Sequence, residues 1–312
     1  MKRTRLITEG AVLLAVYAVL LLTFLYVPVI SMVAIFALPL PFLLFMVRYP
    51  FSNTCMLLGA AILITIIVSS PLSLVNTFMS GIIGISLGYM YKKKKEPAEI
   101  LLVGTLVYLL NFVLVYVASI QFFNIDFLKE MQDMFKQGME QSEEIMKAAG
   151  VPISQEQKDL LGQFSDMLRI LLPSLFVMVS LIYSWITVLI AGNVLKRLKY
   201  TVAPWPKFKD MQLPKSIVWY YVVFILLSTF MKVESDSYVY MAFSNLYAIF
   251  SLLLLFQGFS FIAFFAHAKG YAKAIPILSF IVCMIIPMLF PLVTILGIID
   301  LGFSLRFKIQ SK

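Results

Sequence analysis

Long apolar stretches, separated by prolines and short basic segments, are the main pattern of this sequence. The first stretch runs from Ile7 to Tyr91, contains Arg48 as its single Lys or Arg, and ends at four consecutive lysines. One helical passage through a bilayer needs about 20 apolar residues. Because proline interrupts helices, three prolines divide this stretch into four predicted passes, at residues 7–27, 30–46, 55–69 and 74–91.

The later apolar stretches extend the same pattern to the end of the chain. They predict passes at residues 100–120, 168–194, 217–231 and 239–266, and a last stretch, 274–305, that Pro287 and Pro291 divide in two. The predicted fold class is all-α: a polytopic integral membrane protein with about ten transmembrane helices. We predict a six-span domain at residues 1–199, a basic cytoplasmic linker at 200–215 and a four-span domain at 216–312.

Residues 122–166 interrupt the apolar pattern with nine acidic residues and four lysines. Met131 and Met134 belong to a set of apolar residues that recur at helical spacing, which predicts an amphipathic helical insert. Loops of this length are commonly functional or disordered. Two interpretations remain open: the insert is a lid over a ligand site, or it lies on the membrane surface.

The charge pattern predicts the orientation in the membrane. The formal net charge is +9, only 13% of the residues are charged, and 61% are hydrophobic, which leaves no room for a sizeable soluble domain. With the amino end inside, nineteen of the 25 basic residues face the cytoplasm and the insert is extracytoplasmic. Both termini are then cytoplasmic in a multi-pass protein of the cytoplasmic membrane. The basic residues lie in short loops, so nucleic acid is not an expected partner.

Residues that could carry chemistry are few. The chain has two cysteines, Cys55 and Cys283, and one histidine, His267, which predicts neither a disulfide framework nor a metal site. We expect no catalytic residues, no cofactor and no enzymatic activity. Gly84 and Gly88 lack the context of a phosphate loop and instead predict close helix packing.

Polar residues within the predicted passes are the remaining candidates, because each needs a partner in protein or water. Asn76 and Asn111 either contact a ligand or form interhelical hydrogen bonds, and the same choice applies to three further amides, Asn193, Asn245 and Gln257. Asp300 lies six residues before Arg306 in the last pass. It predicts either a structural salt bridge with Arg306 or a site of proton or cation coupling.

Several motifs resemble those of a known family. The pattern Leu38-Pro-Leu-Pro41 and the hairpin segment from Asn76 to Gly84 resemble the S components of energy-coupling factor (ECF) transporters, over residues 1–199. The whole chain resembles the YybS-like family of Gram-positive bacterial membrane proteins. The S-component resemblance implies that Ala11 and Ala15 dock on a membrane coupling subunit that works with ATPases. S components end after six spans, whereas this sequence continues.

These patterns predict a membrane transport or solute-binding protein for a small neutral or modestly polar molecule. Its ligand would lie under the insert, near Asn76, Asn111, Met131 and Met134. The alternative is a non-transporting membrane scaffold or assembly factor that recruits partner proteins. In either case the lipid bilayer is a partner.

Overall fold

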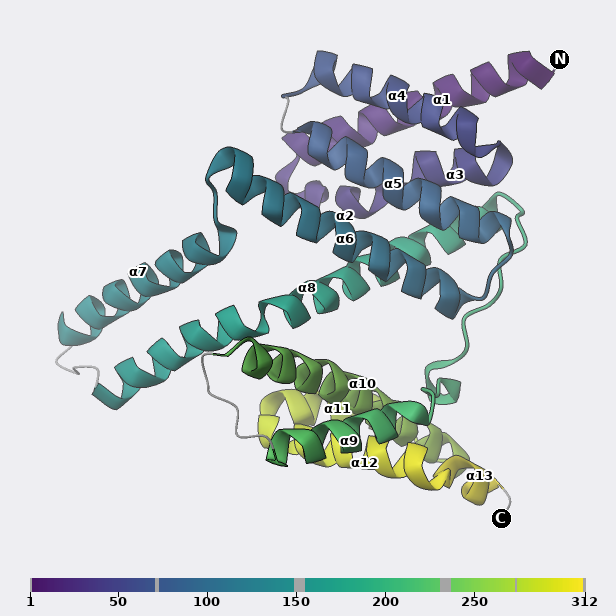
Figure 1. Cartoon of the computed structure of the whole chain (residues 1–312). Coiled ribbons are helices and arrows are strands. Elements are labelled where there is room, and N and C mark those ends of the chain that lie inside the picture. Colours follow the sequence, from purple (N-terminus) through teal and green to yellow (C-terminus); the bar gives the residue numbers. More distant parts are fainter. Residues whose placement is uncertain (1, 71–72, 149–154, 231–236, 273, 311–312) are drawn as a thin grey trace. The chain divides into compact units, whose positions relative to one another are not determined.

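The computed structural model describes residues 2–70, 73–148, 155–230, 237–272 and 274–310. Within these ranges the chain is helical, with no strand, so the predicted all-α fold class is confirmed (Figure 1). The chain forms two compact units. The amino-terminal unit comprises Met1–Val151 and Leu175–Pro204, and the carboxyl-terminal unit comprises Pro152–Ser174 and Trp205–Lys312.

The helices of the first half follow the predicted passes closely. They are α1 (Lys2–Tyr26), α2 (Pro28–Ala37), α3 (Leu40–Arg48), α4 (Phe51–Val68), α5 (Ser73–Lys92), α6 (Pro97–Phe123) and α7 (Phe127–Ala148). Pro28 and Pro97 occupy first helical positions, where proline's missing N–H costs nothing. The predicted second pass is divided at Leu38 and Pro39 into α2 and α3, which together make one apolar segment, Pro28–Arg48.

The second half contains α8 (Gln155–Arg197), the short 3-10 helix η1 (Phe208–Asp210), α9 (Ser216–Phe230), α10 (Tyr238–Ala268), α11 (Ile275–Ile285), η2 (Pro287–Leu289), α12 (Phe290–Phe303) and α13 (Leu305–Gln310). The sequence also predicts that Gly150 and Pro152 end the first helix of the insert and that a second helix follows before the sixth pass. The predicted break lies outside the described residues. In the structure a single helix, α8, leads from the insert into the sixth pass; it runs for 43 residues and contains Pro173.

Seven helical segments in the described ranges are long and apolar enough to cross a membrane. The ninth and tenth predicted passes are not two complete spans. The helix α11 has 11 residues and α12 has 14, so they are about 17 and 21 Å long, less than the roughly 30 Å of a hydrocarbon core. They meet at η2 with a bend of 118°, which turns the chain back on itself. Such a broken pair can return to the side it entered from. The predicted seventh pass, α9, has 15 residues and is not among the seven segments, so a carboxyl end on the same side as the amino end requires that α9 also crosses the membrane.

Glycines allow the closest helix contacts in both units. A Cβ atom at Gly84 would collide with the carbonyl oxygen of Pro39, and one at Gly88 would lie 2.7 Å from the carbonyl oxygen of Leu43. The α5 helix therefore packs directly on the backbone of α3. In the carboxyl-terminal unit, Gly258 and Gly297 bring the backbones of α10 and α12 together in the same way. Small residues at such contacts provide helix association in lipid, where the hydrophobic effect does not.

Candidate functional site: a buried ion pair in the carboxyl-terminal unit

Asp300 and Arg306 form a buried ion pair, with 2.9 Å between Arg306 Nε and Asp300 Oδ2. The Asp300 side chain is 0% exposed and that of Arg306 is 9% exposed. Six residues on a continuous helix would place the two side chains about 120° apart around the axis. Ser304, with a φ of 51°, ends α12 in the left-handed conformation, so α13 leaves in a new direction and Arg306 reaches back to Asp300.

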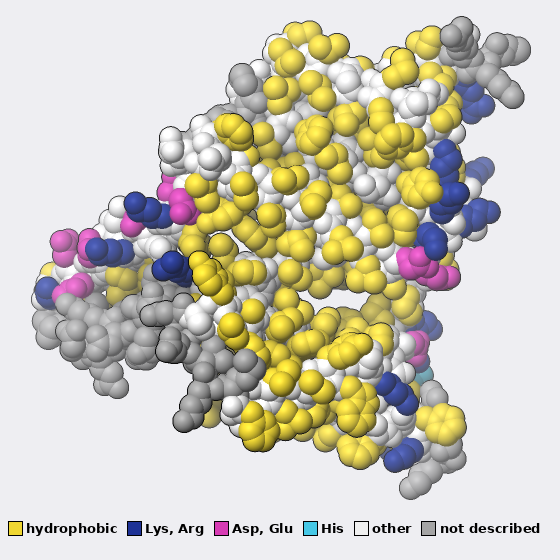
Figure 2. Space-filling view, viewed as in Figure 1, with side chains coloured by type: hydrophobic (Ala, Val, Ile, Leu, Met, Phe, Trp, Pro, Cys, Tyr) yellow, Lys and Arg dark blue, Asp and Glu magenta, His cyan; other side chains and the backbone are white. Residues whose placement is uncertain are grey.

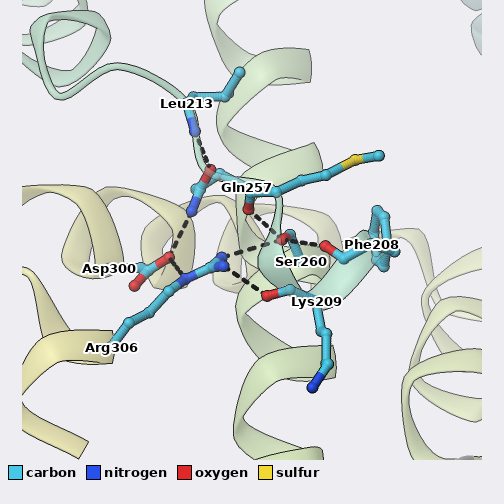
Figure 3. Close-up of polar contacts among 8 residues, drawn as sticks. Phe208, Lys209, Leu213, Gln257, Ser260, Asp300 and Arg306 are labelled. Carbon is cyan, nitrogen blue, oxygen red and sulfur yellow. Dashed lines mark hydrogen bonds and ion pairs between the residues drawn. The ribbon is translucent and has the colours of Figure 1, made fainter. Parts of the chain in front are cut away.

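Gln257 connects this ion pair to α10 and to the segment before α9. Its Nε2 donates a hydrogen bond to Asp300 Oδ2, and its Oε1 accepts one from the backbone N–H of Leu213 at 2.9 Å (Figure 3). Both polar ends of this fully buried amide therefore have partners, as burial requires.

Ser260 and Arg306 together hold η1 against α10. The Ser260 hydroxyl lies 2.8 Å from the carbonyl oxygen of Phe208 and 2.7 Å from that of Met211, and it accepts a hydrogen bond from Arg306 Nη2. Arg306 Nη1 donates to the carbonyl oxygen of Lys209 at 2.7 Å (Figure 3). The guanidinium thus binds a carboxylate, a hydroxyl and a carbonyl at once, which its planar fork of donors permits.

One oxygen of this cluster has no partner. Asp300 Oδ1 is buried and accepts no hydrogen bond from any described residue, whereas Oδ2 accepts two. A buried polar atom of this kind needs an explanation, such as water, an ion or a functional role. In a membrane protein, a buried carboxylate with a free oxygen can take up a proton, coordinate a cation or bind a ligand N–H or O–H group.

The four predicted ligand residues lie on three helices of the amino-terminal unit, α5, α6 and α7. Asn76 is half-buried in α5, and Asn111 is buried in α6, where its amide nitrogen donates to the carbonyl oxygen of Val107 in the same helix. On α7, Met131 is 39% exposed and Met134 is 73% exposed. No hydrogen bond joins any two of the four among the described residues.

Two other predicted amides form interhelical hydrogen bonds. Asn245 of α10 accepts from the backbone N–H of Ser174 and donates to the carbonyl oxygen of Ile170, both in α8, and Gln257 connects α10 with α12. Asn193 is exposed on α8. Ala11 and Ala15 are both exposed on α1.

A second polar cluster, at the amino end of α1, was not predicted as a site. Glu9 accepts hydrogen bonds from Arg5, from Arg48 at 3.0 Å and from the Tyr49 hydroxyl at 2.9 Å. Arg48 also donates to the Tyr200 hydroxyl at 2.8 Å. The spacing of four residues on a helix suggests the pair of Arg5 and Glu9 from the sequence. The contacts of Glu9 with Arg48 and Tyr49 depend on tertiary packing.

The seven apolar segments of membrane-crossing length in the described ranges define this chain as a polytopic α-helical membrane protein. It belongs to the family described as "Predicted membrane protein (DUF2232)", which matches residues 15–301. It is also 32% identical over 311 residues to the "Uncharacterized protein YybS" of Bacillus subtilis (strain 168), a match that covers 99% of this chain and 100% of the relative. No solved structure matches the chain.

The match to YybS confirms the predicted resemblance to the YybS-like family. The resemblance of residues 1–199 to ECF S components stays a prediction.

Proposed function

We propose that this protein is a membrane transport or solute-binding protein of the cytoplasmic membrane, with a small neutral or modestly polar molecule as its ligand. The observation that supports a transport role is Asp300, a fully buried carboxylate in a membrane protein whose Oδ1 has no described partner. Ionisable groups are costly in a membrane interior and typically lie on ion or substrate pathways. In this proposal Asp300 couples ligand movement to that of a proton or cation.

Arg306 makes this role chemically reasonable. Its guanidinium compensates the carboxylate through Oδ2 and leaves Oδ1 open to a proton, a cation or a ligand group. A purely structural salt bridge would favour a paired arrangement that uses both oxygens. Binding at Oδ1 would weaken the attraction to Arg306, and Arg306 also holds η1 through the carbonyl of Lys209.

The ligand site is proposed in the amino-terminal unit, with α7 as its cover. The Asp126 carboxylate accepts hydrogen bonds from the backbone N–H groups of Leu128 and Lys129 at the start of α7, and from the Tyr116 hydroxyl of α6. This cap ties the start of α7 to the end of α6. Met131 and Met134 have flexible apolar side chains that are exposed and free to repack around a guest.

The alternative function is a non-transporting scaffold or assembly factor that recruits partner proteins. The exposed small residues Ala11 and Ala15 are compatible with either function. They leave part of α1 open to close approach by a helix of another protein. If the chain works as an S component, that protein would be a membrane coupling subunit with its ATPases.

The test uses the full-length protein in proteoliposomes that contain a pH-sensitive dye, with small-molecule fractions of a bacterial extract added outside. We expect one fraction to start a proton or cation flux in the wild type, and mass spectrometry of the washed protein to find a stoichiometric small molecule. Asp300→Asn should lower the flux at least tenfold, because it removes the ionisable group. Asp210→Asn, which changes a half-exposed carboxylate of η1, is the matched control and should transport normally.

Two results would overturn the proposal. One is a protein that retains no small molecule and carries no flux but copurifies with stoichiometric partner proteins, which would favour the scaffold. The other is a flux that Asp300→Asn and Asp210→Asn affect equally, which would remove Asp300 from the transport mechanism.

A further inference from the structure

A group of basic residues lies where α5 and α8 end side by side in the amino-terminal unit. The Tyr91 hydroxyl in the last turn of α5 donates to the carbonyl oxygen of Val188 in α8 at 3.1 Å. Lys92 then donates to the carbonyl oxygens of Met46 and Tyr49 at the end of α3. We call the following residues the basic rim: Lys92, Lys93, Lys94, Lys95, Lys196, Arg197 and Lys199.

The basic rim has more positive charge than its neighbours neutralise. Its seven cations, with Arg5 and Arg48 beside them, face three nearby carboxylates, Glu9, Glu96 and Glu99, which gives nine minus three, or +6. Glu99 pairs with Lys95, and Glu9 pairs with Arg5 and Arg48. No described carboxylate pairs with the other six members of the basic rim.

Two of these lysines occupy backbone positions that favour glycine. Lys94 has a φ of 53° and Lys199 a φ of 63°, each in the left-handed turn that ends its helix. The N–H of Lys95 bonds to the carbonyl of Met90, and that of Tyr200 to the carbonyl of Leu195, which is the usual pattern of a glycine-terminated helix. A side chain in the left-handed conformation is disfavoured by steric contact with the backbone. The sequence nevertheless has a lysine at each of these two positions, where glycine would be favoured.

An apolar surface continues from the basic rim along the helices. Tyr89 of α5, Leu102 of α6 and Leu198 at the end of α8 are exposed by 48%, 62% and 43%. Figure 2 shows Lys and Arg side chains gathered at one end of the amino-terminal helices, beside a mostly apolar surface. Lysines at the end of a membrane helix reach the level of the lipid phosphates, while acyl chains cover the apolar surface below.

We infer that the basic rim is a binding site for the phosphate groups of anionic phospholipids in the cytoplasmic leaflet. Unneutralised ammonium groups supply the attraction to phosphate, and the adjoining apolar helices supply contact for the acyl chains. A soluble anion would use only the first of these features. The inference is independent of the proposed transport function, because it concerns the lipid that surrounds the protein and not its ligand.

The test uses the purified full-length chain in detergent, with native mass spectrometry to count bound phosphatidylglycerol or phosphatidylcholine during a titration. The wild type should retain phosphatidylglycerol in preference to phosphatidylcholine. Lys94→Gly with Lys199→Gly removes two charges while giving both turns their favoured residue, so the melting temperature should not fall. Each lysine near an anionic surface contributes about a fivefold factor in affinity, so this variant should bind phosphatidylglycerol about 25-fold more weakly.

Two control variants separate charge from structure. Lys94→Arg with Lys199→Arg keeps the charge and should retain the lipid. Lys136→Gln, at an exposed lysine of α7, should also bind as the wild type does.

Three results would overturn the inference. The first is unchanged phosphatidylglycerol binding by a folded double-glycine variant. The second is complete displacement of the lipid by millimolar inorganic phosphate, which would identify a site for a soluble anion. The third is a wild type without lipid preference that instead copurifies with an acidic protein through these lysines.

Discussion

The contacts of Arg306 in the carboxyl-terminal unit depend on the backbone turn at Ser304. The turn lets Arg306 reach the buried Asp300, and Arg306 then also holds the carbonyl oxygen of Lys209. One guanidinium thus joins α12, α13 and η1, while Gln257 and Ser260 add α10. The same residue that compensates the carboxylate therefore also determines the local fold.

Arg306→Met is predicted to destabilise the protein strongly, because it leaves the Asp300 carboxylate buried without its counterion. Loss of one partner of a buried pair costs about 3–5 kcal/mol. The double variant Asp300→Leu with Arg306→Met should recover most of this loss, since two apolar side chains need no counterion. Thermal unfolding in detergent measures both.

Lys207→Met, at an exposed residue next to η1, serves as the control and should unfold as the wild type does. Equal melting temperatures for Arg306→Met and Lys207→Met would show that the buried ion pair adds little to stability.

At the level of the helices, close packing depends on glycines that the apolar pattern alone does not distinguish. Gly84 and Gly88 lie against the backbone of α3, whereas a Cβ atom at Gly59 of α4 or Gly138 of α7 would meet nothing within 4 Å. Glycine therefore permits a close helix contact in α5, whereas the glycine of α4 lies at no such contact. In α7 the apolar side chains remain partly exposed, and no described residue of that helix is buried.

Gly84→Leu is predicted to disrupt the contact between α5 and α3, because its side chain would occupy the position of backbone atoms of Pro39 and Leu43. Overpacking of this kind typically costs about 1–3 kcal/mol, and a rigid backbone neighbour favours the upper part of that range. The melting temperature and the yield of membrane-inserted protein should both fall.

The matched control is Gly59→Leu, which makes the same change on a helix surface with free space. It should insert and melt normally. A Gly84→Leu protein as stable as the Gly59→Leu protein would contradict the close packing of α5 on α3.

For the whole molecule, the distribution of basic residues predicts the orientation. With the amino end inside, the basic rim, the segment containing η1 and the carboxyl tail all face the cytoplasm, as the positive-inside rule requires. If α9 also crosses the membrane, the bent pair of α11 and α12 can return to the cytoplasmic side, and the carboxyl tail then lies there without two complete passes.

We predict that a cysteine at Ser142 reacts with a membrane-impermeant maleimide in intact cells and that a cysteine at Lys312 does not. The background must lack the two native thiols, of which Cys55 is exposed, so Cys55→Ser and Cys283→Ser are included. Labelling at Lys312 after cell lysis confirms that this thiol is reactive. Labelling at Lys312 in intact cells would contradict a cytoplasmic carboxyl end.

The sequence by itself determined the class of this protein and most of its helices. Apolar runs of about 20 residues have no stable alternative to a helix in a membrane, because lipid cannot satisfy backbone hydrogen bonds. Prolines divided the first apolar stretch, and in the structure Pro28 and Pro97 begin α2 and α6, two and three residues before the predicted starts at residues 30 and 100. The Asp300 and Arg306 candidates also came from the sequence, since a charge in an apolar run is costly and therefore conspicuous.

Only the tertiary structure decided which polar groups meet. Gln257 could have bonded to any neighbouring helix, and it reaches Asp300 because Gly258 and Gly297 let α10 and α12 approach closely. The left-handed turn at Ser304 was equally invisible in an apolar pattern, because hydropathy records which residues avoid water and not the direction of the backbone. The apolar periodicity predicted the α7 helix in the same way. It did not predict the exposure of Met134, because exposure depends on which residues pack against the helix.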